Sequence, residues 1–274
     1  MTPTIVITGG SSGVGLAAAK QLAARGDEVV LIGRDPGRLA AAVEQVRTAG
    51  GGREPQHFRA DFERLDDVRH LADQLLAAYP RIDVLANNAG GIIGRPRETV
   101  DGYEATIQGN HLAPFLLTHL LRDRLTGGRV VNTASRAHIQ GRPGTNFTDD
   151  PKSYSSWRSY GASKAANILF AAEAARRWPD VLSVAFHPGV VRTNFGAGRL
   201  TRLFYRYAPG LTTPEAAGEL LAWLCTAPAG ELRNGAYYVG HTVTRPAAHA
   251  RDPRLAADLW AASRAATGLD PEPA

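Results

Sequence analysis

The chain has 274 residues, of which 44% are hydrophobic, 21% charged and 7% aromatic, and this balance is that of an ordinary globular protein. A formal net charge of +5 is too mild at this length to predict nucleic-acid binding, although it favours a ligand that carries phosphate. No run of about 18 apolar residues occurs, and the N-terminus lacks a basic start followed by a long apolar stretch. We therefore expect a cytoplasmic protein with no integral membrane segment.

Short β-branched runs alternate with longer helical stretches along most of the chain. Strands are predicted at residues 4–8, 28–33, 55–60, 83–88, 129–135, 181–187 and 236–240. Helices are predicted, from apolar spacing near 3.6, at residues 15–26, 37–50, 65–79, 102–125, 161–178 and 214–225. This alternation predicts an α/β fold, a doubly wound parallel sheet of the Rossmann type with about seven strands and helices on both faces.

Neither a repeat nor a low-complexity linker divides the sequence, so we expect a single domain over residues 1–274. Its cofactor half is expected at about 1–135, and its catalytic and substrate-loop half at about 136–270. Two long connections, Arg136 to Arg158 and Thr193 to Thr212, follow strands in the second half. Loops of this length are usually functional, and ligands of open α/β sheets bind beyond the carboxyl ends of the strands.

The first predicted strand runs into TGGSSGVG, which opens a helix. Glycines at this turn let backbone N–H groups approach a pyrophosphate, whose charge is favoured at a helix N-terminus. The spacing T-G-x-x-x-G-x-G is longer than in the usual dinucleotide fingerprint, and a lone glycine-rich turn can also be only a tight connection. The candidate cofactor contacts in this turn are Thr8, Gly9, Ser11, Ser12, Gly13, Val14 and Gly15.

The end of the second predicted strand bears on the choice of cofactor. A fold that prefers NAD places an acid there for the ribose 2′-hydroxyl, but this chain has Gly33 followed by Arg34. An arginine suits a 2′-phosphate, so we expect NADP(H) in preference to NAD(H). The alternative is that Arg34 is a solvated surface arginine. Asp35, followed by Pro36, is explained as the N-cap of the next helix.

Tyr160 and Lys164 lie four residues apart at the start of a predicted helix and therefore share one face. The lysine ammonium stabilises the tyrosinate over the phenol, so the tyrosine can exchange a proton with a carbonyl or alcohol near neutral pH. By itself Y-x-x-x-K is common and mostly structural. Ser135, at the end of the fifth predicted strand, could polarise the same substrate oxygen, and NNAG ends another strand.

Taken together, these motifs resemble the short-chain dehydrogenase/reductase family over nearly the whole chain, to about Leu269. The residues that carry the resemblance are Thr8, Gly9, Gly13, Gly15, Asp61, Asn87 to Gly90, Asn110, Ser135, Tyr160, Lys164 and the HPGVVRT segment from His187 to Thr193. GRD, SRAH and YGASKAANILFAAE are most similar to the branch that contains retinol dehydrogenases and the WW-domain oxidoreductase.

The resemblance implies a catalytic tetrad of Asn110, Ser135, Tyr160 and Lys164. It places Asp61 and Phe62 near the adenine and makes Asn87 hold the sheet beside the cofactor. The remaining cofactor contacts that it implies are Ala89, Gly90, Tyr160, Lys164, Pro188, Gly189, Val191 and Thr193, the last four near the nicotinamide carboxamide.

The expected reaction is reversible hydride transfer between the nicotinamide and a carbonyl or secondary alcohol of a small substrate. Tyr160 exchanges the proton, Ser135 stabilises charge on the oxygen, Lys164 supports the tyrosine and the ribose, and Asn110 orders a water relay. Two alternatives stay open: net non-redox chemistry such as dehydration, epimerisation or ring closure, and a non-catalytic NADP(H)-sensing protein.

The second long connection, residues 196–210, predicts the substrate class. Leu200, Leu203, Phe204 and Tyr207 form an apolar stripe beside a basic stripe of Arg199, Arg202 and Arg206. We expect a mobile lid over a largely apolar pocket that prefers a hydrophobic or aromatic carbonyl compound. An amphipathic surface helix and a membrane-surface role are the alternatives.

Three further expectations concern oligomers, thiols and metals. The 25-residue step from Ser135 to Tyr160 is longer than is usual in the family, so an insertion could cover tetramer-forming helix faces and favour a monomer or homodimer. Cys225, in an apolar helical run, is expected to be a buried structural thiol. No metal site is expected, because H-E-x-x-H and Cys–His spacings are missing among His57, His111, His119, His138, His187, His241 and His249. His111 and His119 are expected to be packing or surface residues, and His187 to hydrogen-bond locally.

Overall fold

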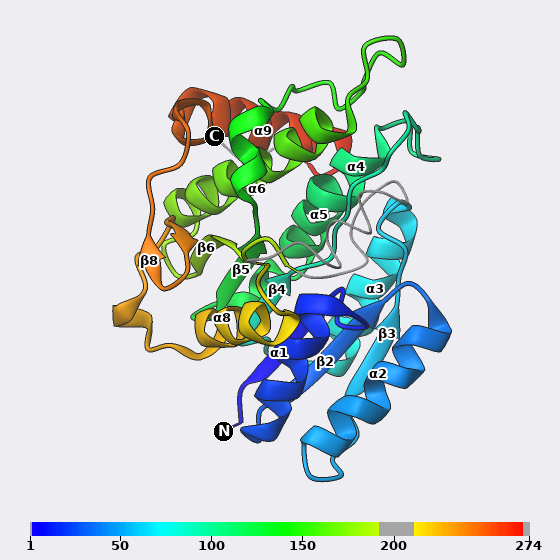
Figure 1. The fold of residues 1–274 in the computed structure, drawn as a ribbon, viewed down its shortest axis with the longest axis vertical. Helices are drawn as coiled ribbons and strands as arrows, with labels where there is room; N and C mark the ends of the chain where they lie inside the picture. The colour runs from blue at the N-terminus through cyan, green and yellow to red at the C-terminus, as the bar shows by residue number, and fades with distance from the viewer. Residues whose placement is uncertain (1, 192–210, 271–274) are drawn as a thin grey trace.

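The structure is a computed structural model that describes residues 2–191 and 211–270, and its centre is one twisted, mostly parallel sheet (Figure 1). The strand order is β3-β2-β1-β4-β5-β6-β7-β8. The strands are β1 Thr4–Thr8, β2 Glu28–Gly33, β3 Gln56–Arg59, β4 Val84–Asn87, β5 Arg129–Thr133, β6 Leu182–His187, β7 Tyr237–Val239 and β8 Thr242–Val243. The order reverses between β1 and β4, which is where an open α/β sheet opens a crevice for a ligand.

The sequence predicted the seven parallel strands but not β8, which pairs antiparallel with β7 through two residues. β8 is too short to show an alternating pattern. Parallel strands buried on both faces read as continuous β-branched runs, and β1 and β2 are of this kind. The predicted fold class, a doubly wound α/β sheet of the Rossmann type, is confirmed.

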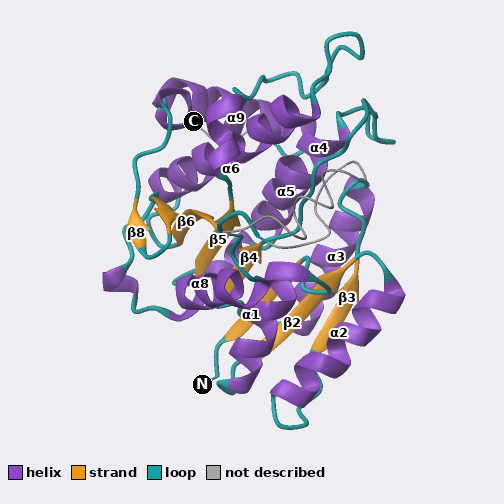
Figure 2. Ribbon diagram, viewed as in Figure 1, coloured by secondary structure: helices purple, strands orange, loops and turns teal. Residues whose placement is uncertain are grey.

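Helices cover both faces of the sheet (Figure 2). The described helices are α1 Gly13–Ala24, α2 Pro36–Ala49, α3 Leu65–Ala78, α4 Ala105–Ile107, α5 Ala113–Leu120, α6 Ser156–Arg177, α8 Pro214–Thr226 and α9 Pro253–Ala266. α1, α2 and α8 contribute to one apolar cluster, whereas α3, α5, α6 and α9 contribute to another on the opposite face. In the part of the chain that the structure describes, no helix is long and apolar enough to cross a membrane.

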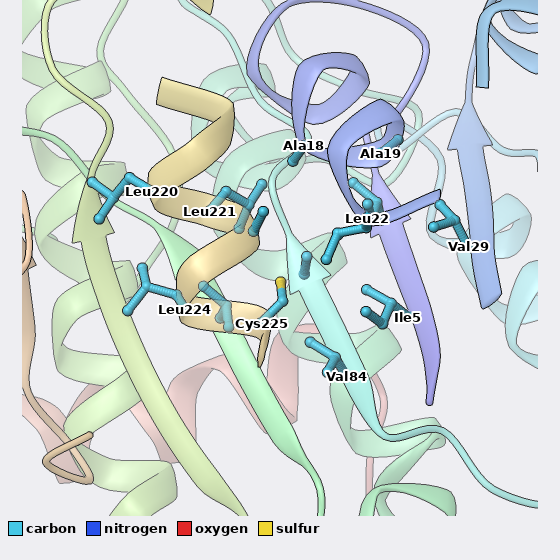
Figure 3. Close-up of a cluster of buried hydrophobic side chains, with 14 of the residues drawn as sticks. Ile5, Ala18, Ala19, Leu22, Val29, Val84, Leu220, Leu221, Leu224 and Cys225 are labelled. Atoms are coloured by element: carbon cyan, nitrogen blue, oxygen red, sulfur yellow. The ribbon is translucent and has the colours of Figure 1, made fainter. Parts of the chain in front are cut away.

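Close packing of α1 on α8 fixes the first helix, and with it the turn that precedes α1. A Cβ atom at Gly218 of α8 would lie 2.6 Å from the Cβ of Ala17 and 2.7 Å from the backbone nitrogen of Ala18. Figure 3 shows the cluster below this contact, where Leu22, Leu221 and Cys225 point toward the sheet. Cys225 is buried as expected, and burial raises the pKa of its thiol to about 12.

One predicted helix is divided into several shorter ones, and one helix was not predicted. The stretch 102–125 is not one helix: α4 leads into a π-helical turn at Gln108–Leu112, then α5, then a 3-10 helix at Arg122–Leu125. α9 was not predicted at all, although Asp252 caps its N-terminus and Pro253 begins it. α9 matters for the site because its side chains pack against the π-helical turn.

The long connection after Ser135 folds back on its own chain. It begins with a 3-10 helix, Arg136–Gln140, and its Phe147 is buried in a cluster with residues of α6 and α9, including Leu169 and Leu259. The Phe147 carbonyl accepts a hydrogen bond from the Glu104 backbone N–H at 2.8 Å. The Ser159 hydroxyl of α6 donates to the Asp149 carboxylate of this connection, which therefore also covers the end of α6 that carries Tyr160.

Candidate active site

The turn between β1 and α1 is built for close backbone approach. Gly9 and Gly13 have φ values of +67° and +54°, which favour glycine. A Cβ at Gly9 would lie 2.9 Å from the Ala89 Cα, and one at Gly15 would lie 2.5 Å from the side-chain nitrogen of Asn88. The backbone after β1 thus packs directly on the backbone after β4.

Thr8 and Asn88 lock the carboxyl ends of β1 and β4 together. The Thr8 hydroxyl oxygen accepts hydrogen bonds from the backbone N–H groups of Asn88 (2.9 Å) and Ala89 (3.0 Å). The Asn88 amide group donates to the Thr8 carbonyl at 2.9 Å. Asn88 was not among the predicted site residues, and its only sequence signal was its position inside NNAG. Its neighbour Asn87 is buried and donates to Thr118 and Asn132, which joins β4 to α5 and β5.

A cleft of about 300 Å³ opens at this end of the sheet. Of the predicted residues, it is lined by Gly9, Ser11, Ser12, Arg34, Asp61, Phe62, Ala89, Gly90 and Asn110. The other predicted residues of this region that do not line the cleft are Thr8, Gly13, Val14, Gly15 and Asn87. A larger hollow of about 690 Å³, lined by Pro3, Asp83 and Arg129 among others, lies at the amino ends of the strands, where parallel sheets seldom bind ligands.

Arg34 is among the residues that line the cleft, and its guanidinium forms ion pairs there. Its side chain is 55% exposed, and its guanidinium approaches Glu63 at 3.1 Å and Asp61 at 3.4 Å. Glu63 also pairs with Arg97. At Gly33 a Cβ would lie 3.0 Å from the Ser11 hydroxyl oxygen, so this position leaves little room for an acidic side chain.

Asp35 caps α2, as the sequence predicted. Its carboxylate accepts a hydrogen bond from the Arg38 backbone N–H at 2.8 Å, and Pro36 is the first residue of the helix. This bond, together with the nearby Arg38 charge, holds the pKa of Asp35 below its usual range.

Tyr160 and Lys164 share one face of α6, as their spacing predicted. The Lys164 Nζ lies 5.4 Å from the centroid of the Tyr160 ring and donates to the Thr133 carbonyl at 3.1 Å. Lys164 is only 3% exposed, and this burial lowers the pKa of its ammonium to about 8. A Cβ at Gly90 would lie 3.3 Å from Lys164 Nζ, so the buried pair adjoins the inner end of the cleft.

Asn110 lies in the π-helical turn, and the extra residue of that turn is common at functional sites. Its amide nitrogen donates to the Gly91 carbonyl and to the Ser163 hydroxyl, both at 2.9 Å, while its oxygen accepts from the Gly91 N–H at 2.8 Å. Asn167 donates to the Asn110 carbonyl (3.0 Å) and to the Thr133 carbonyl (3.1 Å). Asn167 was missed, because only the three-dimensional structure shows that it joins the π-helical turn to β5.

Ser135 lies two residues after the end of β5 and is the N-cap of the 3-10 helix Arg136–Gln140. Its hydroxyl oxygen accepts a hydrogen bond from the Ala137 backbone N–H at 3.1 Å. The end of this 3-10 helix packs backbone to backbone on the first turns of α6. A Cβ at Gly141 would lie 2.2 Å from the Ala162 nitrogen, and one at Gly161 would lie 2.5 Å from the Ala137 carbonyl oxygen. This packing fixes the Ser135 segment against the helix that carries Tyr160.

The segment after β6 is described only in part. Gly189 has a φ of +92°, and a Cβ there would lie 2.2 Å from the Thr212 hydroxyl oxygen. Val191 pairs with Thr212 in an isolated bridge. Thr193 and the expected lid at 196–210 lie outside the described residues. His187 was expected to hydrogen-bond locally, but its Nδ1 is buried with no hydrogen-bond partner in the described chain.

The two histidines of the 102–125 stretch are packing residues. His111 Nε2 lies 2.9 Å from the Ser263 hydroxyl of α9, and burial lowers the pKa of His111 to about 4. His119 Nδ1 lies 2.9 Å from the Phe115 carbonyl, and burial lowers the pKa of His119 to about 3. Among residues 2–191 and 211–270, no group of three or more His, Cys, Asp or Glu side chains is placed to hold a metal ion.

Comparison with known proteins identifies the family. The sequence model of the family "short chain dehydrogenase" matches residues 3–202 of this chain. The chain belongs to the short-chain dehydrogenase family. The Streptomyces sp. (strain C5) protein "Putative daunorubicin C-13 ketoreductase DnrU" is 49% identical over 267 residues, which are 97% of this chain and 92% of that protein. Human retinol dehydrogenase 13 is 32% identical and covers 97% of this chain and 85% of its own.

Solved structures agree with this assignment to the short-chain dehydrogenases. An uncharacterized protein from Mycobacterium paratuberculosis superimposes with a TM-score of 0.81 at 31% identity, covering 98% of this chain and 94% of that one. A short chain dehydrogenase from Shigella flexneri 2a complexed with NADP gives a TM-score of 0.69 at 26% identity, covering 88% and 97%. The family and these relatives make the chain an NAD(P)-dependent dehydrogenase/reductase that acts on CH–OH or C=O groups.

Proposed function

We propose that the protein is an NADP(H)-dependent ketone or aldehyde reductase for a small hydrophobic or aromatic substrate. The observation that carries the proposal is the buried Tyr160–Lys164 pair, which adjoins the inner end of a glycine-lined cleft. In this proposal residues 1–135 form the cofactor half, and residues 136–270 form the catalytic and substrate half. Asn110, Ser135, Tyr160 and Lys164 are the catalytic residues.

The residues present fit a dinucleotide. A Cβ atom at Gly9 or Gly15 would be too close to neighbouring backbone atoms, and one at Gly90 would be too close to the Asn110 side chain. The cleft therefore depends on the lack of side chains at these three positions. Gly9, Ser11 and Ser12 would hold the pyrophosphate, with Arg34 at a 2′-phosphate and Asp61 and Phe62 at the adenine. Lys164 would hold the ribose, and Pro188 to Val191 would lie beside the nicotinamide. The bound cofactor supplies or accepts the hydride.

The chain's own residues move and hold the proton. During reduction the Tyr160 hydroxyl gives its proton to the carbonyl oxygen, and the Lys164 ammonium stabilises the tyrosinate that remains. The Ser135 oxygen already accepts from the Ala137 N–H, and its own O–H is left to donate to the substrate oxygen. The carbonyl carbon gains a hydride, the oxygen gains the Tyr160 proton, and the product is an alcohol.

The preference for NADPH is tested with Arg34→Ala. A charged hydrogen bond to the 2′-phosphate would contribute roughly 1.5 to 3 kcal/mol to binding. Arg34 is half exposed and already pairs with two carboxylates, and both facts reduce this contribution. We therefore expect Arg34→Ala to weaken NADPH binding about tenfold. NADH binding should stay within about twofold. Fluorescence titration of both cofactors measures this, with Arg25→Ala, beside the hollow at the amino ends of the strands, as the control. Equal losses for NADPH and NADH would show that Arg34 does not contact the 2′-phosphate.

Exposed apolar side chains near the tetrad support the proposed substrate class. Trp157 is 39% exposed and lies edge-on to the Tyr160 ring, with centroids 6.1 Å apart. Ile139, in the 3-10 helix after Ser135, is 64% exposed, and Val190, beside Gly189, is 45% exposed. Exposed apolar and aromatic side chains favour contact with apolar and aromatic ligands. The 49% identical relative is named as a ketoreductase, which agrees with this proposal.

The substrate class is tested by turnover of NADPH with 9,10-phenanthrenequinone, a planar aromatic diketone, and with glyceraldehyde. We expect the quinone to have the higher kcat/KM, and Trp157→Ala to raise its KM about tenfold, the effect of losing roughly 1.4 kcal/mol of contact. Oxidation of NADPH in equal amount to the alcohol formed distinguishes a reductase from an enzyme of net non-redox chemistry or a sensor. A preference for glyceraldehyde would contradict the proposed substrate class.

We also propose a monomer or homodimer. The connection 141–155 supports this, because its Phe147 packs on α6 and α9 of the same chain and covers a surface that these helices would otherwise present. Sedimentation equilibrium of the full chain tests it, and a stable tetramer would contradict it.

A further inference from the structure

His138 lies three residues after Ser135 and is almost fully buried behind it. Its ring Nδ1 lies 2.7 Å from the Ser135 carbonyl oxygen. On the other side of the ring, Nε2 accepts a hydrogen bond from the Ala247 backbone N–H at 3.1 Å. The ring also stands edge-on to Tyr237 of β7, with centroids 5.2 Å apart. His138 is therefore held from β7 and from the segment that follows β8.

These contacts determine which ring nitrogen of His138 carries the proton. A backbone N–H can only donate, so Nε2 must be an acceptor without a hydrogen. A neutral imidazole has one N–H group, so the hydrogen is on Nδ1 and is donated to the Ser135 carbonyl. If Nε2 were protonated, its N–H would face the N–H of Ala247, and neither group could accept a hydrogen bond from the other. The titratable groups around the ring are Arg136, His187, Tyr237 and His249.

Ser135 is left with one unused hydrogen-bonding group that matters for a substrate. Its carbonyl accepts two bonds, one from the His138 ring (2.7 Å) and one from the His138 backbone N–H (3.1 Å). Its hydroxyl oxygen accepts one from Ala137 (3.1 Å). The hydroxyl hydrogen is left to donate, and it is the donor that a carbonyl substrate needs.

We propose that His138, in its Nδ1-protonated neutral form, is a positioning residue that fixes Ser135 and so aims the serine hydroxyl at the substrate oxygen. The proposal rests on the proposed role of Ser135. It also gives Ala247, in the segment after β8, a role in the reaction, whereas the contact of His249 with the His138 carbonyl only supports the fold. Ala247 sets the tautomer of His138, and His249 donates to the His138 carbonyl at 2.8 Å.

Two conservative variants separate positioning from folding. His138→Asn places an amide N–H near the position of Nδ1 and keeps the donor to Ser135, whereas His138→Gln places its amide oxygen near Nε2 and keeps the acceptor for Ala247. We expect His138→Asn to keep kcat within about twofold, and His138→Gln to lower kcat about three- to tenfold with KM and melting temperature close to those of His138→Asn. Kinetics with NADPH and 9,10-phenanthrenequinone measure this.

Controls make the outcome specific. His249→Ala removes the bond to the His138 carbonyl but not the contact with Ser135, so it should lower stability and leave kcat unchanged. Equal kcat losses for the Asn and Gln variants, or full kcat for the Gln variant, would overturn the proposal. Ser135→Ala tests the proposed function itself. If that variant keeps wild-type kcat, Ser135 is not catalytic, and it is the proposed function that has failed and not the inference about His138.

A second measurement does not depend on turnover or on a variant that folds poorly. Nitrogen-15 NMR of histidine side chains in the full wild-type chain at pH 7 reports the tautomer of each ring. We expect the His138 signals, identified by their loss in either variant or by their contact with Tyr237 ring protons, to be those of the Nδ1-protonated neutral form. An Nε2-protonated or doubly protonated ring would overturn the proposal.

Discussion

Gly141→Ala tests the backbone contact that joins the Ser135 segment to α6. Gly141 has φ −142°, an extended conformation that alanine adopts readily, so the change acts only through the added methyl group. That methyl carbon would lie 2.2 Å from the Ala162 nitrogen and 2.2 Å from the Arg158 carbonyl oxygen. Both are backbone atoms of α6, which cannot move aside as a flexible side chain can.

The size of the effect follows from these distances. Ordinary contacts begin at about 3.4 Å, so the 3-10 helix and α6 must separate by about 1 Å. Overpacking of this kind lowers stability by about 1 to 3 kcal/mol, and a displacement of about 1 Å between reacting groups lowers kcat about 100-fold. Each kcal/mol corresponds to a melting temperature roughly 2 to 4 °C lower in a chain of this size.

Steady-state kinetics and thermal unfolding followed by circular dichroism measure both effects. The matched control is Gly230→Ala, at a position where an added Cβ would meet no described atom within 4 Å. The control should keep wild-type kcat and melting temperature. If Gly141→Ala keeps kcat within twofold of the control, the packing of these two backbones does not set the geometry of Ser135 and Tyr160, and our reasoning is wrong.

Three further predictions concern single side chains. Tyr160→Phe should bind NADPH like the wild type by fluorescence titration but lose more than nine-tenths of its turnover, because only the proton-transferring oxygen is removed; a variant that keeps more would contradict its role as the acid. Burial lowers the pKa of Lys164 to about 8 from an unfolded value of 10.5, so the folded state binds fewer protons than the unfolded state between these values. The cofactor-free protein should therefore gain stability as the pH rises from about 8 to 10.5, by on the order of 3 kcal/mol in urea unfolding, and Lys164→Met should lack this rise; a rise of equal size in the variant would refute the assignment. Burial raises the pKa of Cys225 to about 12, so the native thiol should stay unreactive toward a disulfide reagent at pH 8 and react once urea unfolds the chain; rapid reaction of the folded protein would show that Cys225 is accessible.

The strands and the residues at their carboxyl ends were predictable because their signals are local. The β-branched run of β1 and the glycines after it are contiguous, and the four-residue spacing of Tyr160 and Lys164 places them on one helix face whatever the rest of the chain does. Asp35 was predicted correctly as a cap for the same reason, since its partner is the N–H three residues on.

Two residues that the sequence did not single out, Asn88 and Asn167, depend on partners far away in the sequence. Asn88 donates to Thr8, 80 residues earlier, and Asn167 donates to Asn110, 57 residues earlier. The π-helical turn was missed for another reason. Its extra residue changes the path of the backbone but not the composition, so the stretch looks like a regular helix in the sequence. α9 was missed although its cap and its apolar spacing are local, so in that case the signal was present and was overlooked.

The contacts of α9 bear on the order in which the site is completed as the chain leaves the ribosome. Ser263 of α9 is the partner of His111, and His111 is the residue after Asn110 in the π-helical turn. The hydroxyl of Tyr103, just before that turn, donates to the Ala266 carbonyl at 2.9 Å. Strands β1 to β4 can pair early in synthesis, because their partners lie within the first 90 residues. Asn110 gains its full support only after α9 has emerged, so a nascent chain can pair its first four strands before the π-helical turn that carries Asn110 is completed.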